Sequence, residues 1–391
     1  MLDMLANLWF FKRLRKTRFY CRVRQRFPWS EWSYISDFAH MADANAVSID
    51  WPSSVPKPVF GIIRDHERCP RWTKYCRFLD ANSFSYRIYD IHGHDWLNAA
   101  ADFDVIVGMP SGELHHLLEI RRKFHVVETY LGKACYPTAA HVLLYEDKFV
   151  EAFIARAHEL PFANTYVSND KTDAMRMVDD LNYPVVSKIV PSSGSVGVQM
   201  VRTARQARRI VAAAFSRSGR PTHLRHFRQK DYVYFQDFVH SDGYDIRAIV
   251  IGNFVFGYYR EALKGDFRAS GMNLVEKRAL PKEAMILARR LNAVVKSPML
   301  AVDMLHGLDG KYHIIEFSPF CQMDTPEQLH VGGVPGAYVF DDEETCRFEE
   351  GKWWCHELAL KEYLITDYLP KMLRHRMDLP PAFTDRGGCL V

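Results

Sequence analysis

The stretch Tyr312-His-Ile-Ile-Glu-Phe-Ser-Pro319, together with Ala301-Val-Asp303 upstream, decides the fold of this 391-residue chain. Apolar runs flank Asp309-Gly310, and an Asp-Gly pair between such runs is a strong signal for a β-hairpin. A two-residue turn at this position pairs Leu308 with Lys311. The sequence therefore predicts two antiparallel strands whose register can be counted outward from the turn.

This register places two carboxylates and a hydroxyl at the open end of the hairpin. Asp303 falls opposite Glu316, and Ser318 shares the face of Glu316 because strand side chains alternate with a period of two. Hard cations such as Mg²⁺ take oxygen ligands of this kind beside the phosphates of a nucleotide. Carboxylates on a strand can equally be solvated surface groups, so the rest of the chain has to favour one interpretation.

The composition is typical of a soluble globular protein. Apolar residues make up 48% and charged residues 25% of a chain that is long enough for two or three domains. The net charge of +4 is too small to indicate a nucleic-acid partner. No apolar run reaches the roughly 18 residues of a membrane span, and the eight cysteines contain no CxxC pair. We therefore expect a cytoplasmic protein with reduced thiols.

Residues 1–57 are predicted to form a basic, aromatic arm followed by an irregular linker. Lys, Arg and aromatic side chains alternate between positions 8 and 26. Such a segment suits peripheral contact with an anionic membrane, contact with a polyanion or partner subunit, or packing over its own domain. The sequence leaves these alternatives open, and it leaves a homo-oligomer open as well.

Three further units are predicted beyond the arm. Residues 58–135 alternate short apolar runs with helical patterns, which indicates a small parallel α/β sheet with right-handed crossovers. Residues 136–330 have an α+β pattern of largely antiparallel strands and end in the hairpin described above. Residues 331–391 form a C-terminal extension that is expected to be helical, with one helix over residues 353–373.

Lys188 and the Ser/Gly-rich loop of residues 191–197 are a candidate phosphate site. The lysine ends an apolar strand, and the loop offers backbone N–H groups and hydroxyls with little steric bulk. The loop is not a Walker A motif, because no GK[ST] follows it. The alternative is a hairpin loop beside an ordinary surface lysine.

A second hairpin places two arginines on one strand face. A turn at Gly252-Asn253 pairs Asp245 with Arg260 and Arg247 with Tyr258. Two guanidinium groups, one of them held by a carboxylate, suit a fixed phosphoryl or carboxylate group. The alternative is a simple cross-strand ion pair that contributes about 0.2–1 kcal/mol.

These segments occur in an order that resembles a known superfamily. In sequence they are Tyr136-Pro137, Asp147-Lys148, Tyr183-Pro-Val-Val-Ser-Lys188 with its loop, Gln236-Asp-Phe-Val239, Asp245-Ile-Arg247, Arg260-Glu-Ala262, Gly265-Asp-Phe-Arg268, Val302-Asp303 and Ile315-Glu-Phe-Ser-Pro319. The series resembles the ATP-grasp superfamily and is most similar to the branch of the ribosomal-protein glutamate ligases and glutathione synthetases. The resemblance covers about residues 58–330.

The resemblance implies an α/β plus α+β architecture in which a small parallel-sheet domain precedes two antiparallel-sheet subdomains that clamp ATP. The residues implied to contact the ATP phosphates are Lys148, Lys188, Ser193, Gly194, Ser195 and Gly197. Those implied to line the adenine pocket are Gln236, Phe238 and Val239. Those implied to bind two Mg²⁺ ions are Asp303, Glu316 and Ser318. Arg260 would stabilise the transferred phosphoryl group, with Arg247 and Arg268 nearer the acceptor substrate.

Two positions depart from the pattern of the superfamily. Ser318 stands where asparagine is usual, and its hydroxyl is a shorter and weaker Mg²⁺ ligand, which puts the second metal ion in doubt. Gln236 replaces a common glutamate and removes one charge at the adenine pocket.

The implied reaction is an ATP-dependent ligation. A carboxylate attacks the γ-phosphate of ATP, and an amine then attacks the acyl phosphate, which gives an amide, ADP and phosphate. The acid and the amine are open, and small molecules, peptides and glycans are all compatible. A kinase that phosphorylates a hydroxyl and a non-catalytic nucleotide-binding scaffold are the alternative functions.

Overall fold

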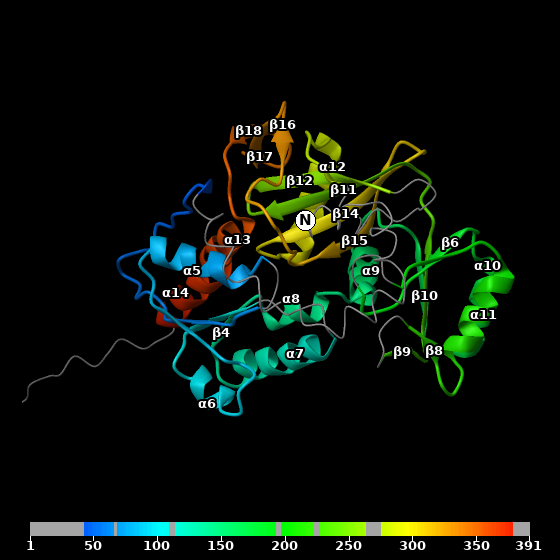
Figure 1. Ribbon diagram of the computed structural model, residues 1–391, viewed down its shortest axis with the longest axis horizontal. Coiled ribbons are helices and arrows are strands. Elements are labelled where there is room, and N and C mark those ends of the chain that lie inside the picture. The colour runs from blue at the N-terminus through cyan, green and yellow to red at the C-terminus, as the bar shows by residue number, and fades with distance from the viewer. Residues whose placement is uncertain are drawn as a thin grey trace, which may run out of the picture.

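The structure is a computed structural model that describes residues 43–65, 69–108, 114–192, 197–222, 227–262 and 275–377 (Figure 1). The described residues form one parallel sheet, a small and a large antiparallel sheet, and a two-stranded ribbon of β8 (Arg220–Pro221) and β9 (Arg228–Gln229). The arm of residues 8–26, with its predicted membrane or partner contact, lies outside the described residues. None of the described helices combines the length and the hydropathy that crossing a bilayer needs.

The N-terminal sheet is parallel, as predicted. Its order is β2–β1–β3–β4. The strands are β1 (Phe60–Ile62), β2 (Tyr86–Ile88), β3 (Val105–Val107) and β4 (Ala134–Tyr136), and the helices are α5 (Arg71–Ala81), α6 (Trp96–Ala100) and α7 (Leu114–Thr129). Each of the first three strands lies within a predicted apolar run, whereas β4 was not predicted. Its three residues are too short to show a strand pattern by themselves.

Part of the predicted linker belongs to the hydrophobic core. Val47 and Val55 are buried. The indole of Trp51 packs against Phe84 at a centroid distance of 5.3 Å and against Tyr368 at 6.4 Å. The stretch of residues 43–57 therefore joins the N-terminal domain to the C-terminal end of the described chain instead of forming a separate linker.

The small antiparallel sheet carries two helices on one of its faces. Its order is β5–β10–β6–β7. Its elements are β5 (Thr165–Ser168), β6 (Val185–Ser187), β7 (Gln199–Val201), β10 (Val233–Asp237), α10 (Lys171–Asp180) and α11 (Ala204–Ala214). Val233 and Phe235 pack in the core beneath α10 and α11. Because strand side chains alternate, Tyr234 and Gln236 point to the opposite face. The helices α8 (Ala139–Leu144) and α9 (Lys148–Ala157) precede this sheet.

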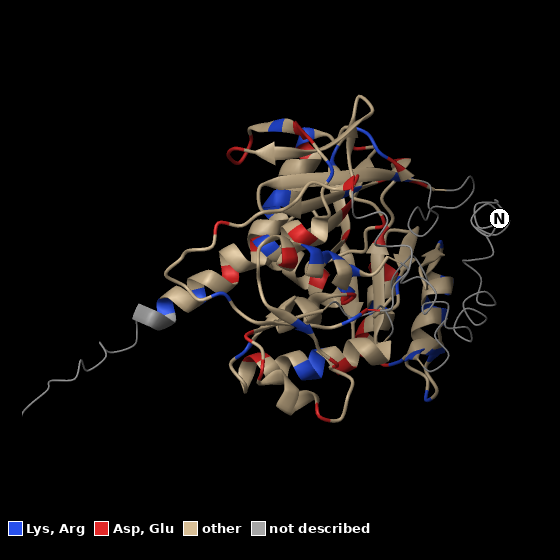
Figure 2. Cartoon of the chain, turned by 60° about the vertical axis from the view of Figure 1, so that its left-hand side comes forward, with Lys and Arg blue, Asp and Glu red and all other residues tan. Residues whose placement is uncertain are grey.

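The large antiparallel sheet runs in the order β15–β14–β11–β12–β17–β16, with β13 on β12 and β18 on β17. Its elements are β11 (Ser241–Ile251), β12 (Phe254–Glu261), β13 (Val275–Glu276), β14 (Leu300–Gly307), β15 (Tyr312–Ser318), β16 (His330–Val331), β17 (Val334–Phe340), β18 (Cys346–Glu350) and the helix α12 (Lys282–Val295). One face packs against α12 around Ile246, Val302 and Ile314. The charged residues described below lie on strands of this sheet and project from its other face. Figure 2 marks the acidic and basic positions along the chain.

The C-terminal region differs from the predicted helical extension in its first twenty residues. Residues 330–350 form β16, β17 and β18 and extend the large sheet beyond β12. Helices follow as expected: α13 (Cys355–Tyr363), a π-helical turn (Leu364–Tyr368) and α14 (Leu369–Met377). Trp354 is fully buried before α13, and α13 packs on α5 (Figure 1).

Candidate active site

The turn of the β14–β15 hairpin differs from the prediction. The backbone N–H of Gly307 donates to the carbonyl of Lys311 at 2.8 Å, so Leu308, Asp309 and Gly310 form a three-residue turn. The predicted pair of Leu308 and Lys311 is therefore wrong. Gly310 has a φ of 77°, a left-handed conformation that glycine adopts without steric cost.

A β-bulge restores the predicted register before the charged end of the hairpin. The pairing shifts between Asp303 and Met304, which leaves Ile315 as the extra residue on β15. Asp303 consequently lies opposite Glu316, as predicted. The bulge also reverses the alternation of side chains: Ile314 points into the core, whereas Glu316, two residues later, points to the opposite face.

Asp303 is the centre of a buried ionic network on β11, β12 and β14. The guanidinium of Arg247 donates to both carboxylate oxygens of Asp303, at 2.7 and 2.8 Å. Arg260 contacts Asp303 at 2.7 Å and holds Asp245 at 2.5 and 2.9 Å. The predicted pairs of Asp245 with Arg260 and of Arg247 with Tyr258 are both confirmed. The carboxylate of Asp303 on β14 thus holds one arginine on the adjacent strand β11 and one on β12, the strand beyond it.

The electrostatics of this network favour the charged forms of most of its members. Burial raises the pKa of Asp303, but the positive charges of Arg247 and Arg260 outweigh burial and hold that pKa well below its usual range. Burial and the neighbouring guanidinium of Arg247 lower the pKa of Arg260. The carboxylates of Asp303 and Asp245 have the larger, opposite effect, so the pKa of Arg260 lies above its ordinary value. Asp303 and Arg260 therefore favour their charged forms, whereas burial raises the pKa of Asp245 despite its contact with Arg260.

Two lysines from different elements meet the outer side of β15. Asp147 caps α9 by accepting from the N–H groups of Phe149 and Val150, which places Lys148 in the first helical turn. The ammonium of Lys148 contacts Glu316 at 3.1 Å. Lys188, directly after β6, donates to the carbonyl of Ile315, the bulged residue, at 3.0 Å.

The two lysines have opposite pKa shifts. Burial lowers the pKa of Lys148, but the carboxylates of Glu316 and Glu146 outweigh burial and raise it above its ordinary value. Burial dominates at Lys188, where the attraction of Glu316 does not compensate for it, and its pKa falls to about 8. Lys188 is consequently the lysine whose charge changes in a mildly alkaline solution.

The loop predicted to cover the phosphates is described only at its ends. The ammonium of Lys148 donates to the carbonyl of Ser192 at 2.5 Å, and Gly197 has a φ of 81°. Lys148 therefore joins the beginning of the loop to Glu316. The predicted residues Ser193, Gly194 and Ser195 lie outside the described residues, as does Arg268.

The predicted adenine residues lie where the small sheet continues into the large one. Gln236 is buried, and its amide donates to the hydroxyl of Thr165 at 3.1 Å. It shares a strand face with Tyr234, whose ring centroid lies 5.9 Å from the ammonium of Lys188. Phe238 and Val239 follow in the connection from β10 to β11, and they are partly buried.

The predicted metal ligands form an oxygen-rich group on one strand face. Asp303 and Glu316 are cross-strand neighbours, and Ser318 lies two residues further along β15, where its hydroxyl donates to the carbonyl of Phe320 at 2.6 Å. Among the described residues, no three His, Cys, Asp or Glu side chains are grouped as a metal site would need. The group therefore fits a cation that takes one or two carboxylates and completes its coordination with phosphate oxygens and water, which is how Mg²⁺ is usually held.

Asp303 can still offer oxygen ligands while it is held by two arginines. An ionised carboxylate has about four lone-pair positions, so oxygens that accept from a guanidinium can also ligate a cation. The side chain of Glu316 is 33% exposed and that of Asp303 is 7% exposed. Glu316 is therefore the more accessible ligand of the two.

Sequence reasoning missed two glutamates beside the lysines. The carboxylate of Glu151 accepts from the backbone N–H of Phe317 at 3.1 Å, and Glu146 lies 4.0 Å from the ammonium of Lys148. Burial raises the pKa of Glu146 to about 6. Glu151 follows Lys148 by three residues, so both lie on one face of a helix. This spacing is the sequence feature from which the position of Glu151 beside the site could have been predicted.

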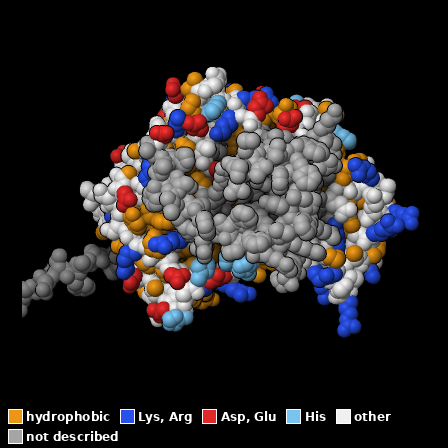
Figure 3. All heavy atoms as spheres, viewed as in Figure 1, with side chains coloured by type: hydrophobic (Ala, Val, Ile, Leu, Met, Phe, Trp, Pro, Cys, Tyr) orange, Lys and Arg blue, Asp and Glu red, His pale blue; other side chains and the backbone are white. Residues whose placement is uncertain are grey.

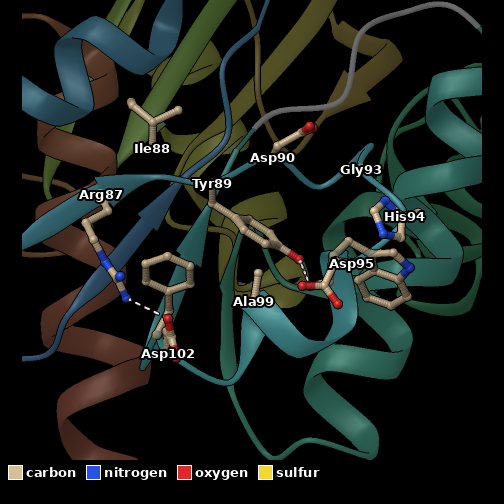
Figure 4. Close-up of a pocket in the computed structure, with 11 residues that line it drawn as sticks. Arg87, Ile88, Tyr89, Asp90, Gly93, His94, Asp95, Ala99 and Asp102 are labelled. Atoms are coloured by element: carbon tan, nitrogen blue, oxygen red, sulfur yellow. Dashed lines mark hydrogen bonds and ion pairs between the residues drawn. The ribbon is translucent and has the colours of Figure 1, made fainter.

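Two surface hollows lie away from this group. One, of about 310 Å³, lies in the N-terminal domain between the ion pair of Arg87 with Asp102 and the segment around Trp96 (Figure 4). The other, of about 540 Å³, lies along α10 and α11, where Lys and Arg side chains gather at that end of the molecule (Figure 3). Neither hollow is lined by a predicted site residue.

Comparisons with known proteins identify the central part of the chain. Residues 145–329 match the family model of the RimK-like ATP-grasp domain. The α-aminoadipate–LysW ligase LysX of Saccharolobus solfataricus is 25% identical over 265 residues, which cover 63% of this chain and 88% of that relative. Residues 145–329 of the chain are therefore similar to an ATP-grasp domain of the RimK-like kind.

The fold of this chain is also similar to a solved structure. That of D-cycloserine synthetase DcsG matches with a TM-score of 0.52 and 15% identity, over 78% of this chain and 99% of that chain. The predicted architecture of a parallel-sheet domain followed by antiparallel sheets is therefore confirmed. The relative LysX is named as a ligase and the protein of the matching solved structure as a synthetase.

Proposed function

We propose that this chain is an ATP-dependent ligase that joins a carboxylate to an amine through an acyl phosphate formed from ATP. We place its reacting site at the open end of the β14–β15 hairpin. The observation that carries the proposal is the meeting of Asp303, Glu316, Lys148 and Lys188, which come from four different elements. Two carboxylates and two ammonium groups at one strand end suit a triphosphate with a divalent cation.

The two lysines are proposed to hold the phosphates of ATP. Lys148 and Lys188 approach β15 from the side of the small sheet, and each has an ammonium that can exchange its present carbonyl or carboxylate partner for a phosphate oxygen. The loop of residues 193–197, predicted to cover the phosphates, begins beside Lys148. Exclusion of water by this loop would protect the acyl phosphate from hydrolysis.

Mg²⁺ would be held by Asp303, Glu316 and Ser318. When bound, the ion supplies positive charge that neutralises the phosphate oxygens during phosphoryl transfer. Ser318 is the weakest of the three ligands, so we propose one firmly held ion and a second that depends on ATP for most of its coordination.

The arginines are proposed to stabilise charge next to the reacting carboxylate. Arg260 is nearly buried and held by two aspartates, whereas the side chain of Arg247 is 22% exposed. Arg260 would therefore supply a fixed positive charge near the transferred phosphoryl group, and Arg247 would lie nearer the acceptor. Arg268 is proposed for the acceptor side from the resemblance alone.

The acid and the amine are small molecules, peptides or glycans in this proposal. The name of LysX assigns that relative an α-aminoadipate substrate. This supports an amino acid as one of the first substrates to test here, with the ionised network of Arg247 and Arg260 suited to an anionic group.

The test is to trap the activated acid. The purified full chain is incubated with ATP, Mg²⁺ and a panel of amino acids and peptides, with and without hydroxylamine, while ADP release and hydroxamate are measured. A hydroxamate that requires both ATP and one particular acid supports the ligase mechanism. A stable phosphorylated hydroxyl compound would indicate a kinase, and ATP binding without turnover on the whole panel would indicate a scaffold.

A further inference from the structure

The strand β15 is the outer strand of the large sheet, so its outward-facing backbone groups need partners other than a strand. The N–H and carbonyl of Ile314 pair with Pro161 and Ala163 at 2.8 Å each. The carbonyl of Ile315 accepts from Lys188 at 3.0 Å, and the N–H of Phe317 donates to Glu151 at 3.1 Å. Side chains of α9 and of the small sheet thus take the place of a neighbouring strand beside Glu316.

Glu151 lies next to Glu316 and Phe317 of β15. It is 1% exposed, and it lies one helical turn after Lys148 on the same face of α9. Lys148 contacts the side chain of Glu316 while Glu151 holds the backbone of Phe317. The helix therefore contacts two consecutive residues of β15, one through its side chain and the other through its backbone.

We propose that Glu151 is a positioning residue that fixes Glu316 for the magnesium nucleotide by accepting from the backbone N–H of Phe317. The inference rests on the proposed function of Glu316 as a metal ligand. The backbone is held on both sides of Glu316, by Lys188 at Ile315 and by Glu151 at Phe317. The partly exposed carboxylate thereby projects from a fixed backbone.

A general stabilising role does not account well for this arrangement. A buried carboxyl group is a costly partner for a single N–H, because removing it from water is expensive unless the site uses it. Burial raises the pKa of Glu151 well above its ordinary value, against the positive charges of Lys148 and Lys188. Loss of a group that orients a metal ligand without touching the metal commonly weakens metal binding by about 10–100-fold.

Two substitutions of similar size separate the hydrogen bond from the charge. Glu151→Gln keeps an oxygen that can accept from Phe317 but cannot ionise, whereas Glu151→Met removes the acceptor. Arg156→Gln, an exposed change on the same helix, is the control. For each full-length protein, the Mg²⁺ concentration that gives half-maximal nucleotide binding is measured by calorimetry at fixed nucleotide, together with the melting temperature.

We expect Glu151→Met to raise the half-saturating Mg²⁺ concentration by about 10–100-fold. Glu151→Gln should stay within about threefold of the wild type, and Arg156→Gln should match it. A folded Glu151→Met protein with wild-type magnesium dependence would overturn the inference, as would a Glu151→Gln protein as impaired as Glu151→Met. If Glu151→Met does not fold, Glu151→Gln decides: a normal magnesium requirement supports the acceptor role, and an increased one overturns it.

The same experiment separates this inference from the proposed function. A wild-type protein whose nucleotide binding does not respond to Mg²⁺ contradicts the proposed site itself, and the inference with it. A wild type that responds to Mg²⁺, together with a folded Glu151→Met protein of the same magnesium dependence, contradicts the inference alone.

Discussion

The charged residues of the site fall into two regions that are built in different ways. In the inner region, Asp245, Arg247, Arg260 and Asp303 lie on adjacent strands of one sheet, and two-pronged contacts join them. In the outer region, Glu316 accepts a hydrogen bond from Lys148 of α9. Lys188, which follows β6 of the small sheet, donates to the adjacent carbonyl of Ile315. The register of one sheet fixes the inner region, whereas the outer region exists only when two subdomains meet.

The inner region is expected to contribute mainly to stability and the outer region mainly to activity. The inner network is buried and most of its members favour their charged forms, so breaking it leaves unpaired charges in the interior. In the outer region the two ammonium groups donate to carbonyl and carboxylate oxygens that a triphosphate can replace, and Glu316 is partly exposed. We therefore expect substitutions in the inner region to lower the free energy of unfolding and substitutions in the outer region to lower activity with little change in stability.

The largest effect on activity is expected for Glu316→Ala. Loss of the accessible metal ligand should lower the rate of ADP release by about 10³-fold or more, because the charge on the transferred phosphoryl group is no longer neutralised. The free energy of unfolding should fall by less than about 1 kcal/mol, since Glu316 is partly exposed and the buried Lys148 keeps its contact with Ser192. Near-normal turnover in a folded Glu316→Ala protein would remove this residue from the site.

The largest effect on stability is expected for Asp303→Ala. This change leaves the guanidinium groups of Arg247 and Arg260 without the carboxylate that joins them, which should cost about 3–5 kcal/mol of unfolding free energy. Denaturant unfolding, compared with that of Glu316→Ala, measures the contrast between the two regions. Equal stability losses in the two variants would show that the regions do not differ as described.

A smaller effect on nucleotide affinity is expected for Lys188→Ala. Loss of one charge-assisted contact to phosphate should weaken ATP binding by about 10–100-fold. The wild type should also show a pH dependence, because burial lowers the pKa of Lys188 to about 8 and only the protonated form binds phosphate well. ATP affinity should fall by up to about tenfold per pH unit above that value.

Lys188→Arg is the matched control for this pH dependence, since arginine stays protonated throughout the accessible range. Calorimetry between pH 6.5 and 9.5 makes the comparison. An ATP affinity that is unchanged in Lys188→Ala, or a wild-type affinity that is flat above pH 8, would exclude Lys188 from the phosphate site.

The smallest effect is expected for Ser318→Asn. An amide oxygen reaches further than a hydroxyl and is a stronger Mg²⁺ ligand, so the magnesium requirement should fall or remain within about threefold of the wild type. Measuring ADP release against Mg²⁺ concentration tests this expectation. Severe inactivation would mean that the contact of the serine hydroxyl with the carbonyl of Phe320 has another purpose.

The sequence predicted the functional end of the hairpin better than its turn. The predicted register was wrong at Leu308 and Lys311 and correct at Asp303 and Glu316, because a three-residue turn and a bulge at Ile315 compensate for each other. A bulge has no sequence signature as clear as that of an Asp-Gly turn, so alternation alone could not reveal it. The hairpin of β11 and β12 has a regular register, and its pairs were predicted correctly throughout.

Contacts between subdomains were the part that the sequence could not predict. Strand patterns report neighbours within one sheet, and they do not show that Lys188 reaches the carbonyl of Ile315 or that Glu151 reaches the N–H of Phe317. The strands of residues 330–350 were also missed, because a short strand that only extends an existing sheet carries a weak pattern. In each case the missing information is the packing of one element on another.

The most direct test of the account is a calorimetric titration of a non-hydrolysable ATP analogue, with and without Mg²⁺, into the wild type and Glu316→Ala. If the nucleotide binds with Mg²⁺ beside Glu316, we expect magnesium-dependent heat at a single site in the wild type. The folded Glu316→Ala variant should show no such heat. Absence of heat in the wild type, or equal heat in both proteins, would contradict the placement of the nucleotide at the end of β14 and β15.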